Sequence, residues 1–302
     1  MNITTAHIPV LTLNNGVKLP TVGLGVFLSP PEQTATAVEH AIQSGYRLID
    51  TAAAYLNERQ VGQGINRSGI DRSELFITTK LWMTDYGYEN TLRALGVSLR
   101  KLGLEYVDLY LLHWPVPSDF EKTIDSYTAM EKLIGDGNVR AVGVSNFSPT
   151  HLKNLMERTE VVPAVNQVEL SPFFTQRELR EAHKRLGIVT QSWSPIGGVY
   201  SRNPKAAPES AKSPLEHPVM LRISTKYRKT PAQIVMRWHI DHGLSAIPKS
   251  VRPERISENI DIFDFALTTD EMAEIDALDS GIRAGADPEQ VNAGTWPIKI
   301  ED

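Results

Sequence analysis

Short apolar segments alternate along most of the chain with longer stretches that have helical periodicity. Eight of these segments have the length of strands, and they occupy residues 21–25, 46–50, 75–80, 107–113, 139–146, 164–169, 188–193 and 244–250. The stretches between them include residues 31–45, 90–103 and 175–187, and each of these ends at a glycine, the usual residue just past a helix. The pattern predicts an α/β fold.

Eight strands separated by helices are expected to pair in parallel, because each return to the same sheet needs a crossover. Segments that are apolar on both faces are typical of a parallel sheet covered by helices. Eight such units favour a closed (β/α)8 TIM barrel, with residues 1–302 as a single domain. An open doubly wound sheet would usually carry G-x-G-x-x-G after its first strand if it bound a dinucleotide. Because GLGVFL and GQGINR both lack the third glycine, the barrel is the better interpretation.

Three further segments stand outside this alternation. Residues 10–20 alternate apolar and polar positions around Asn15-Gly16, which predicts a hairpin with a two-residue turn that covers the bottom of the barrel. Residues 197–218 are rich in Pro, Ser, Ala and Lys and follow the seventh strand. A loop this long is usually a lid or a binding loop, so we expect it at the face that carries the site. The tail, residues 281–302, is similarly irregular.

Charge and composition narrow the class of partner. The net charge is −5 with both signs interspersed, so no basic stripe is available for nucleic acid. The chain has no cysteine, which excludes disulfides and thiolate chemistry and fits a reducing cytoplasm. No secretory signal and no apolar run of the ~18 residues that span a bilayer is visible. We expect a soluble cytoplasmic protein with a small-molecule partner and no membrane association.

Polar residues end seven of the eight predicted strands. In a parallel barrel these ends meet at one rim, where polar side chains are normally catalytic or bind ligands. The residues are Asp50, Lys80, His113, Ser145 with Asn146, Asn166 with Gln167, Trp193 with Ser194, and Lys249 with Ser250.

Asp50, Tyr55, Lys80 and His113 form a chemically coherent set within this group. A carboxylate stabilises a neighbouring ammonium, and the ammonium in turn is expected to lower the pKa of a phenol from its usual value of about 10. A neutral imidazole can donate a hydrogen bond to an oxygen that gains negative charge. The set therefore suits the reduction of a carbonyl, in which a hydride goes to carbon and a proton goes to oxygen.

The motifs LIDTAAAY, TTKLW, LLHWP, VGVSNF, NQVE, WSPIGG and IPKSVRPERISEN occur in this order. In these motifs the chain resembles the aldo-keto reductase superfamily, and it is most similar to bacterial members such as 2,5-diketo-D-gluconate reductases. The resemblance extends from GLGVF to ADPEQVN in the carboxyl-terminal tail. It implies an NADPH-dependent reductase of aldehydes or ketones that is commonly a monomer.

The resemblance also implies a role for individual residues. Tyr55 corresponds to the general acid, Lys80 and Asp50 to the pair that sets its pKa, and His113 to the residue that orients the carbonyl. The positions that match the cofactor site are Ser145, Asn146 and Gln167 for the nicotinamide carboxamide, Trp193 for stacking on its ring, Ser194 and Gly197 for the pyrophosphate, and Lys249, Ser250, Val251, Arg252, Arg255, Glu258 and Asn259 for the adenosine 2′-phosphate and adenine. Residues 197–218 correspond to a loop that clamps the cofactor.

The last of these groups has a physical interpretation of its own. The segment KSVRPER places several cations and a hydroxyl at the start of a short predicted helix, where anions are favoured. It therefore suits a phosphate monoester, and NADPH should be preferred over NADH. The predicted substrate walls are Phe27, Trp82, Trp114 and Trp296, and sugar-derived diketones, keto esters and reactive aldehydes such as methylglyoxal remain open as substrates.

Two rival functions and one possible metal site follow from the same residues. Lys80 could form a Schiff base as in barrel aldolases, although Asp50 beside it favours the ammonium form. The chain could instead bind NADPH tightly and report redox state with slow turnover. The motif HIDH, residues 239–242, has a spacing that could bind metal, but without further ligands it is interpreted as a helix surface, and no metal is assigned.

Overall fold

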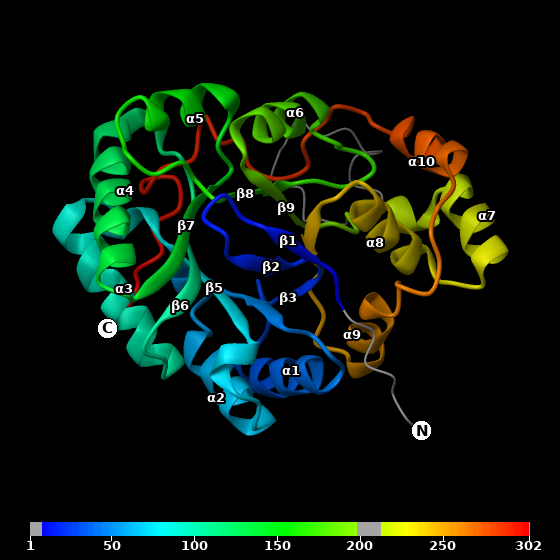
Figure 1. Cartoon of the computed structure of the whole chain (residues 1–302), viewed down its shortest axis with the longest axis horizontal. Helices are drawn as coiled ribbons and strands as arrows, with labels where there is room; N and C mark the ends of the chain where they lie inside the picture. The colour runs from blue at the N-terminus through cyan, green and yellow to red at the C-terminus, as the bar shows by residue number, and fades with distance from the viewer. Residues whose placement is uncertain (1–7, 198–212, 302) are drawn as a thin grey trace.

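The computed structural model describes residues 8–197 and 213–301, and a single eight-stranded sheet forms its centre (Figure 1). Every neighbouring pair in this sheet is parallel, and the strands follow one another in chain order. The strands are β3 (Gly23–Gly25), β4 (Leu48–Asp50), β5 (Phe76–Leu81), β6 (Val107–Leu112), β7 (Val139–Ser145), β8 (Val165–Glu169), β9 (Val189–Trp193) and β10 (Ser245–Ile247).

The first and last strands meet, so the sheet closes on itself. Parallel bridges join Val22 to Ala246 and Gly25 to Lys249, and the amide of Gly25 donates to the carbonyl of Pro248 at 3.0 Å. A Cβ at Gly25 would lie 2.9 Å from the carbonyl oxygen of Ile247, so a glycine lets the two backbones approach here. Because an open sheet would leave β3 and β10 as edges, the predicted (β/α)8 barrel is confirmed.

Helices surround the barrel on the outside (Figure 1). They are α1 (Pro31–Gln43), α2 (Glu58–Ser68), α3 (Tyr88–Leu102), α4 (Phe120–Gly135), α5 (Pro149–Met156), α6 (Arg177–Leu186), α7 (Pro218–Tyr227), α8 (Pro231–Asp241), α9 (Pro253–Ile260) and α10 (Thr269–Asp276). Short 3-10 turns are η1 (Ala53–Tyr55), η2 (Arg72–Glu74), η3 (Met83–Asp85), η4 (Pro117–Asp119) and η5 (Pro214–Glu216). The stretches predicted as helices over 31–45 and 175–187 contain α1 and α6, and the stretch over 90–103 covers α3 except for its first two residues. The glycines that follow α3 and α6 adopt positive φ values of 68° and 70°.

The hydrophobic core has two layers. The outer layer lies between the helices and the sheet, and the inner layer fills the barrel. The inner layer takes alternate residues from successive strands, because side chains of a strand point to opposite faces in turn. Its members include Leu48, Phe76, Leu109, Leu111, Ala141, Val165 and Ile247.

The amino-terminal hairpin packs against this inner layer and covers one end of the barrel. β1 (Val10–Thr12) pairs antiparallel with β2 (Lys18–Pro20), and Leu19 is fully buried in the inner cluster. The predicted two-residue turn is wrong. The amide of Leu13 donates to the carbonyl of Val17 at 2.9 Å, so the loop has three residues, and only Gly16 takes a positive φ, of 86°. An extra residue with Gly in the left-handed region is the usual form of a three-residue hairpin loop.

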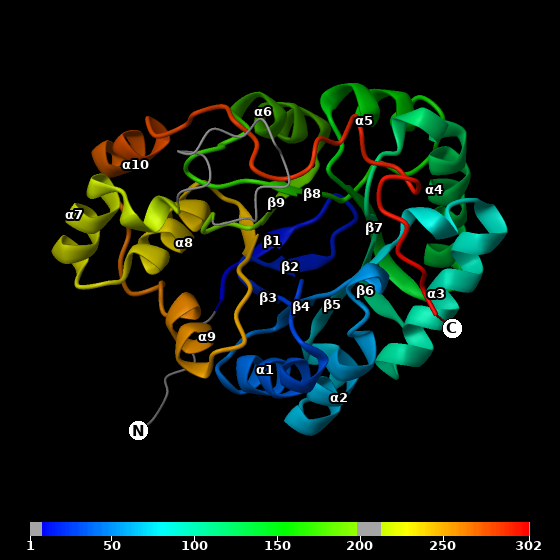
Figure 2. The same cartoon turned by 180° about the vertical axis from the view of Figure 1, so that it is seen from behind.

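The carboxyl-terminal tail lies at the opposite end of the barrel. Figure 2 shows it running from α10 past α6 and α5 to the end of the chain near α3. As predicted, residues 281–301 contain no helix or strand. Most of the expected 197–218 loop, residues 198–212, lies outside the described residues. The part that is described carries η5 and the start of α7.

The motif HIDH forms a helix surface only in part, because Asp241 is exposed whereas His239 points inward. His239 in α8 is fully buried, and its ring nitrogens lie 2.9 Å from the carbonyl of Val235 and 3.3 Å from that of Leu170. Burial lowers the pKa of His239 to about 4, so its ring is neutral and structural. No helix among the described residues is long and apolar enough to cross a membrane.

If the hairpin stabilises the barrel by plugging it, Leu19→Ala should lower the free energy of unfolding by about 2–5 kcal/mol, through lost burial and a new cavity. Urea denaturation measures this change. Val10→Ala on the same hairpin is the matched control, because Val10 is 45% exposed, and it should change stability by less than about 0.5 kcal/mol. A loss of less than about 1 kcal/mol in Leu19→Ala would mean that the hairpin does not support the inner core.

Candidate active site

The two-residue period of the strands explains why polar groups gather inside the barrel. Asp50 stands two residues after Leu48, and His113 stands two residues after Leu111, so each points to the same side as an inner-core residue. Lys80 follows Phe76 by four positions on β5 and also points inward. Each of these three strands therefore places apolar side chains in the barrel interior and a polar side chain at its carboxyl end.

Lys80 is the centre of the resulting cluster. Its Nζ donates to Asp50 Oδ1 at 2.5 Å, to the carbonyl oxygen of Thr51 at 2.9 Å and to Tyr55 Oη at 3.3 Å. These three acceptors use the three N–H groups of an ammonium. Asp50 in turn accepts at Oδ2 from Gln167 Nε2 at 2.7 Å. Because donors surround the carboxyl group and acceptors surround the amine, the geometry fits a carboxylate and an ammonium.

Lys80 and Asp50 are 0% and 2% exposed, so both charges lie out of water. Burial lowers the pKa of Lys80 and raises the pKa of Asp50, while the opposite charge of each partner counteracts these shifts. A buried pair of this kind seldom repays its own desolvation, so stability alone does not explain it.

The environment of Tyr55 differs from the sequence-based expectation. Burial and the nearby Asp50 carboxylate raise the pKa of Tyr55 well above its ordinary value, instead of the lowering expected from Lys80. The physical reason is that burial disfavours the phenolate and outweighs the lowering expected from the Lys80 ammonium. Tyr55 is therefore a neutral phenol. It accepts one hydrogen bond from Lys80, which leaves its own O–H free to donate elsewhere.

His113 lies next to Tyr55, with ring centroids 5.6 Å apart. Burial, together with the charge of Lys80, lowers the pKa of His113 well below its ordinary value, so the imidazole is neutral as expected. Its Nδ1 has no hydrogen-bond partner among residues 8–197 and 213–301. A neutral ring beside a neutral phenol offers two hydrogen-bond donors to one acceptor atom.

A second group of polar residues from β7, β8 and β9 adjoins the cluster. Ser145 Oγ donates to the carbonyl of Gln167 at 2.8 Å, and Asn146 Nδ2 donates to the carbonyl of His113 at 3.0 Å. Asn146 has a positive φ of 67°, and its Oδ1 accepts from Trp193 Nε1 at 2.9 Å. This bond fixes the edge of the half-buried Trp193 ring. Four predicted residues are thus held together.

Asn166, which stands next to Gln167, does not join them. It points away from the barrel interior, where its Nδ2 donates to the carbonyl of Phe147 at 2.8 Å. Its Oδ1 accepts from the amide of Phe147 at 3.3 Å, so its side chain brackets the backbone after β7. Asn166 is structural.

The basic group lies after β10 and at the start of α9. Lys249, Arg252 and Arg255 are exposed, and within the described part of the chain none of them forms an ion pair. Ser250 Oγ accepts from the amide of Arg252 at 3.1 Å. Glu258 Oε1 accepts from Thr230 Oγ1 at 2.6 Å, which orients Glu258. The remaining two predicted residues are the half-buried Val251 and the buried Asn259. Three unpaired cations beside a hydroxyl fit a phosphate monoester.

Ser194 and Gly197 form a turn directly after β9. The amide of Gly197 donates to the carbonyl of Ser194 at 2.9 Å. Both residues have positive φ values, 50° for Ser194 and 68° for Gly197. The predicted cofactor-clamping loop continues from here into residues 198–212, outside the described residues.

The four aromatic side chains of the predicted substrate walls lie beside the cluster or against one another. Phe27 is 46% exposed and lies 5.0 Å from the Tyr55 ring. Trp82 lies 5.1 Å from His113 and stacks on Trp296 of the tail at 6.1 Å. Trp114 meets Trp296 edge-on at 5.7 Å. The buried Nε1 atoms of Trp82 and Trp114 have no hydrogen-bond partner in the described chain, so the wall offers two further donors.

Sequence analysis missed the residue that holds the tail over this region. Glu169, at the carboxyl end of β8, accepts at Oε1 from the amide of Ala284 at 2.8 Å and at Oε2 from the amide of Gly285 at 2.9 Å. Its burial raises its pKa, while the charge of Arg283 and these two amides counteract the rise. Glu169 ends a strand, as Asp50 does, which is the signal that could have identified it.

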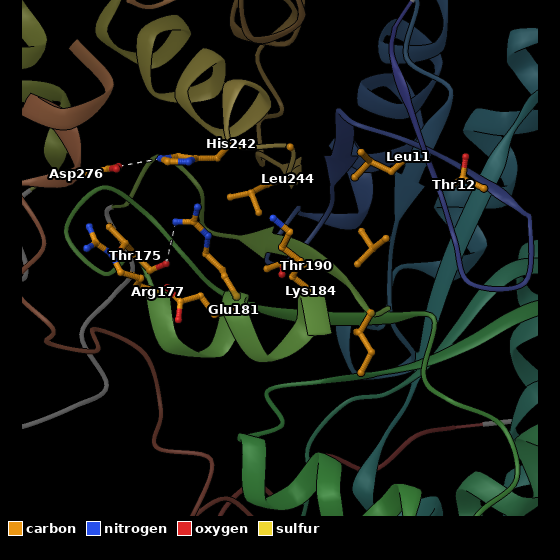
Figure 3. Close-up of a pocket in the computed structure, with 14 residues that line it drawn as sticks. Leu11, Thr12, Thr175, Arg177, Glu181, Lys184, Thr190, His242, Leu244 and Asp276 are labelled. Carbon is orange, nitrogen blue, oxygen red and sulfur yellow. Dashed lines mark hydrogen bonds and ion pairs between the residues drawn. The ribbon is translucent and has the colours of Figure 1, made fainter. Parts of the chain in front are cut away.

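A separate cavity of about 680 Å3 lies beside α6, near the end of α8 and β1 (Figure 3). Its wall includes Lys184 and Leu11, and His242 pairs there with Asp276 at 2.8 Å. None of the predicted site residues lines it. Val189, in its wall, begins β9, so this part of the cavity lies at the end of the strand away from the cluster.

Comparison with known proteins identifies the family. The aldo/keto reductase family model matches residues 22–280. Morphine 6-dehydrogenase of Pseudomonas putida is 53% identical over 288 residues, which cover 95% of this chain and 97% of that protein. Glyoxal reductase of Bacillus subtilis is 46% identical over 280 residues, with 92% and 96% covered. A crystal structure of a Bombyx mori aldo-keto reductase in complex with NADP superposes with a TM-score of 0.85 at 37% identity, and 97% of each chain is covered.

The chain belongs to the aldo/keto reductase family. It is an NADP-dependent oxidoreductase that acts on carbonyl compounds, as the sequence predicted. The residues present fit NADPH, because three cations without an ion-pair partner in the described chain are available for a phosphate monoester, and a half-buried indole has its edge fixed by hydrogen bonding.

The contact between Glu169 and the tail predicts that adding one methyl group at Gly285 lowers the catalytic activity. In Gly285→Ala, the new Cβ would lie 2.7 Å from Glu169 Oε2 and 2.7 Å from Trp193 Cη2, so the tail or the indole must move. We expect kcat/KM for carbonyl reduction to fall roughly tenfold to a hundredfold.

Gly294→Ala in the same tail is the control, because its Cβ would meet only the end of the Asn292 side chain, at 3.1 Å. This variant should stay within about twofold of the wild type. Equal kcat/KM values for the two variants would show that the Glu169 contact does not position the site.

Proposed function

We propose that the protein reduces aldehydes and ketones to alcohols, with Tyr55 as the general acid. The observation that carries this proposal is the hydrogen bond from Lys80 Nζ to Tyr55 Oη beside the neutral ring of His113. The Tyr55 hydroxyl and a ring N–H of His113 are therefore two neighbouring donors that could both bind one carbonyl oxygen.

Tyr55 suits the role of general acid because its hydroxyl stays protonated until the carbonyl oxygen gains negative charge. Its raised pKa keeps it protonated near neutral pH. As the carbonyl oxygen gains negative charge, it becomes a far stronger base than the phenol's conjugate base, and the proton moves to it. The ammonium of Lys80, already bonded to Oη, stabilises the phenolate that forms.

His113 and the aromatic wall orient the substrate. His113 donates a hydrogen bond to the carbonyl oxygen without competing as an acid, because its ring is neutral. Bound NADPH supplies the hydride that reaches the carbonyl carbon. Phe27, Trp82 and Trp114 exclude water from the carbonyl.

The residues that would hold the cofactor follow the carboxyl ends of β7 to β10. Trp193 would supply a ring for the nicotinamide, and Ser145, Asn146 and Gln167 would bind its carboxamide. Ser194 and Gly197 would bind the pyrophosphate, while the basic group from Lys249 to Asn259 would bind the 2′-phosphate. The support for this placement is that these residues lie in sequence around one rim and that the cations have no partner in the described chain.

The substrates that we propose carry a second oxygen next to the reacting carbonyl, as in dicarbonyl aldehydes, sugar-derived diketones and keto esters. The Nε1 atoms of Trp82 and Trp114, which have no partner among residues 8–197 and 213–301, would bind that oxygen. The similarity to a protein named glyoxal reductase agrees with this class of substrate.

A Schiff base on Lys80 is disfavoured by the same geometry. That chemistry needs a neutral amine with a free lone pair, whereas all three N–H groups of Lys80 have acceptors and Asp50 lies at 2.5 Å.

Tyr55→Phe tests the proposal by removing only the acidic hydroxyl. We expect kcat to fall by about 10²–10⁴-fold over a panel of glyoxal-type aldehydes, diketones and keto esters, with NADPH binding unchanged. NADPH consumption measured by absorbance, with NADH in parallel, gives both activity and cofactor preference.

Phe27→Leu serves as the control, because it alters the wall and leaves the acid in place. Normal turnover in Tyr55→Phe would show that Tyr55 is not the proton donor. Tight NADPH binding by a wild type that reduces nothing on the panel would instead favour a redox-sensing role.

A further inference from the structure

A continuous chain of hydrogen bonds crosses the barrel interior from the site to the hairpin. Gln167, Gln191 and Ser245 are aligned in register on β8, β9 and β10, and they are 1%, 0% and 0% exposed. Gln167 Nε2 donates to Asp50 Oδ2 and to Gln191 Oε1, both at 2.7 Å. Gln191 Nε2 donates to Ser245 Oγ at 3.1 Å, and Ser245 Oγ donates to the carbonyl of Pro20 at 3.1 Å.

The hairpin end of this series of hydrogen bonds determines the direction in which each group donates. The carbonyl oxygen of Pro20 can only accept, so the single hydroxyl proton of Ser245 is used there. The oxygen of Ser245 is then left to accept, and Gln191 must turn its NH₂ group toward it. The carbonyl oxygen of Gln191 consequently faces Gln167.

The site end dictates the same polarity independently. The carboxylate of Asp50 can only accept, so Gln167 must turn its NH₂ group toward it. The second hydrogen of that NH₂ group points to the oxygen of Gln191. Because both ends require one orientation, the amide of Gln167 is locked, with its NH₂ group used and its Oε1 left as an acceptor.

We propose that Gln191 and Ser245 are positioning residues for the cofactor. They reinforce the orientation of the Gln167 amide that Asp50 also requires, so that Oε1 is held available to accept an N–H of the nicotinamide carboxamide while Nε2 supports Asp50. This inference rests on the proposed contact between Gln167 and the cofactor. It extends the site from the rim to a serine at the amino end of β10.

A purely structural role would have a different signature. A buried polar chain that only satisfies itself would affect folding stability when broken, and it would leave NADPH affinity unchanged. The proposal requires that affinity changes, even for a substitution at Ser245, which touches neither the cofactor nor Asp50.

Two serine-to-alanine variants separate these outcomes. Ser245 and Ser192 are both fully buried, on neighbouring strands, but Ser192 Oγ has no hydrogen-bond partner in the described chain. Fluorescence titration of the full-length protein with NADPH should show that Ser245→Ala binds roughly fivefold to tenfold more weakly, because the amide of Gln191 is free to flip. Ser192→Ala should bind as the wild type does. Equal affinities in the two variants would overturn the proposal.

Gln191 provides a second, rescuable test. Gln191→Met removes the acceptor that Gln167 needs and should weaken NADPH binding roughly tenfold. Gln191→Glu should bind within about threefold of the wild type at about pH 6, where burial keeps the introduced carboxyl protonated and able both to accept and to donate. Equal weakening in both variants would show that hydrogen-bond polarity is not the cause and would overturn the proposal.

Gln167→Ala distinguishes the inference from the function on which it rests. If this variant binds NADPH normally, the proposed cofactor contact of Gln167 is wrong, and the inference falls with it. If Gln167→Ala binds weakly while Gln191→Met and Ser245→Ala bind normally, only the inference fails. Thermal unfolding of each variant shows whether a weak binder is folded.

Discussion

The buried ion pair between Lys80 and Asp50 is the interaction on which the rest of the site depends. Taking both charges out of water is costly, and the pair persists because the remaining positions around it are filled. Thr51 and Tyr55 accept from the ammonium, and Gln167 donates to the carboxylate. Each of these groups is thereby oriented by the pair. Without the pair, the phenol of Tyr55, the amide of Gln167 and the backbone at Thr51 would lose the hydrogen-bond partner that positions them.

The barrel makes this arrangement possible by separating stability from chemistry along the strands. Alternate residues of each strand fill the lower interior with apolar side chains, closed from below by Leu19 of the hairpin. The same alternation places a polar residue at the rim, beyond the last apolar residue that points inward. The outer core between sheet and helices carries most of the apolar burial, so the rim tolerates buried charge and unpartnered donors such as those of Trp82 and Trp114. The tail then covers this region, held through Glu169.

Much of this architecture is predictable from the sequence, because strand ends and parity are local properties. An apolar segment that ends in Asp50 or Lys80 already predicts where that side chain points. Contacts between side chains on neighbouring strands are not local, since they depend on the stagger between the strands. The pairing of Gln167 with Gln191 could not be inferred for this reason. The raised pKa of Tyr55 escaped prediction because it depends first on how deeply the phenol is buried, and then on its distance from the Asp50 carboxylate. His239 was misplaced because a polar residue in a helix is usually exposed, and here backbone carbonyls satisfy its ring.

A double-mutant cycle on the ion pair tests its role most directly. Asp50→Asn and Lys80→Met should each lower the free energy of unfolding by about 3–5 kcal/mol, because each leaves one buried charge without its partner. The double variant should recover most of that stability, since no buried charge remains, yet its kcat should stay as low as that of Lys80→Met. This result would show that the pair is kept for chemistry. A double variant that is as unstable as the sum of the single variants, or one that reduces carbonyls at the wild-type rate, would contradict it.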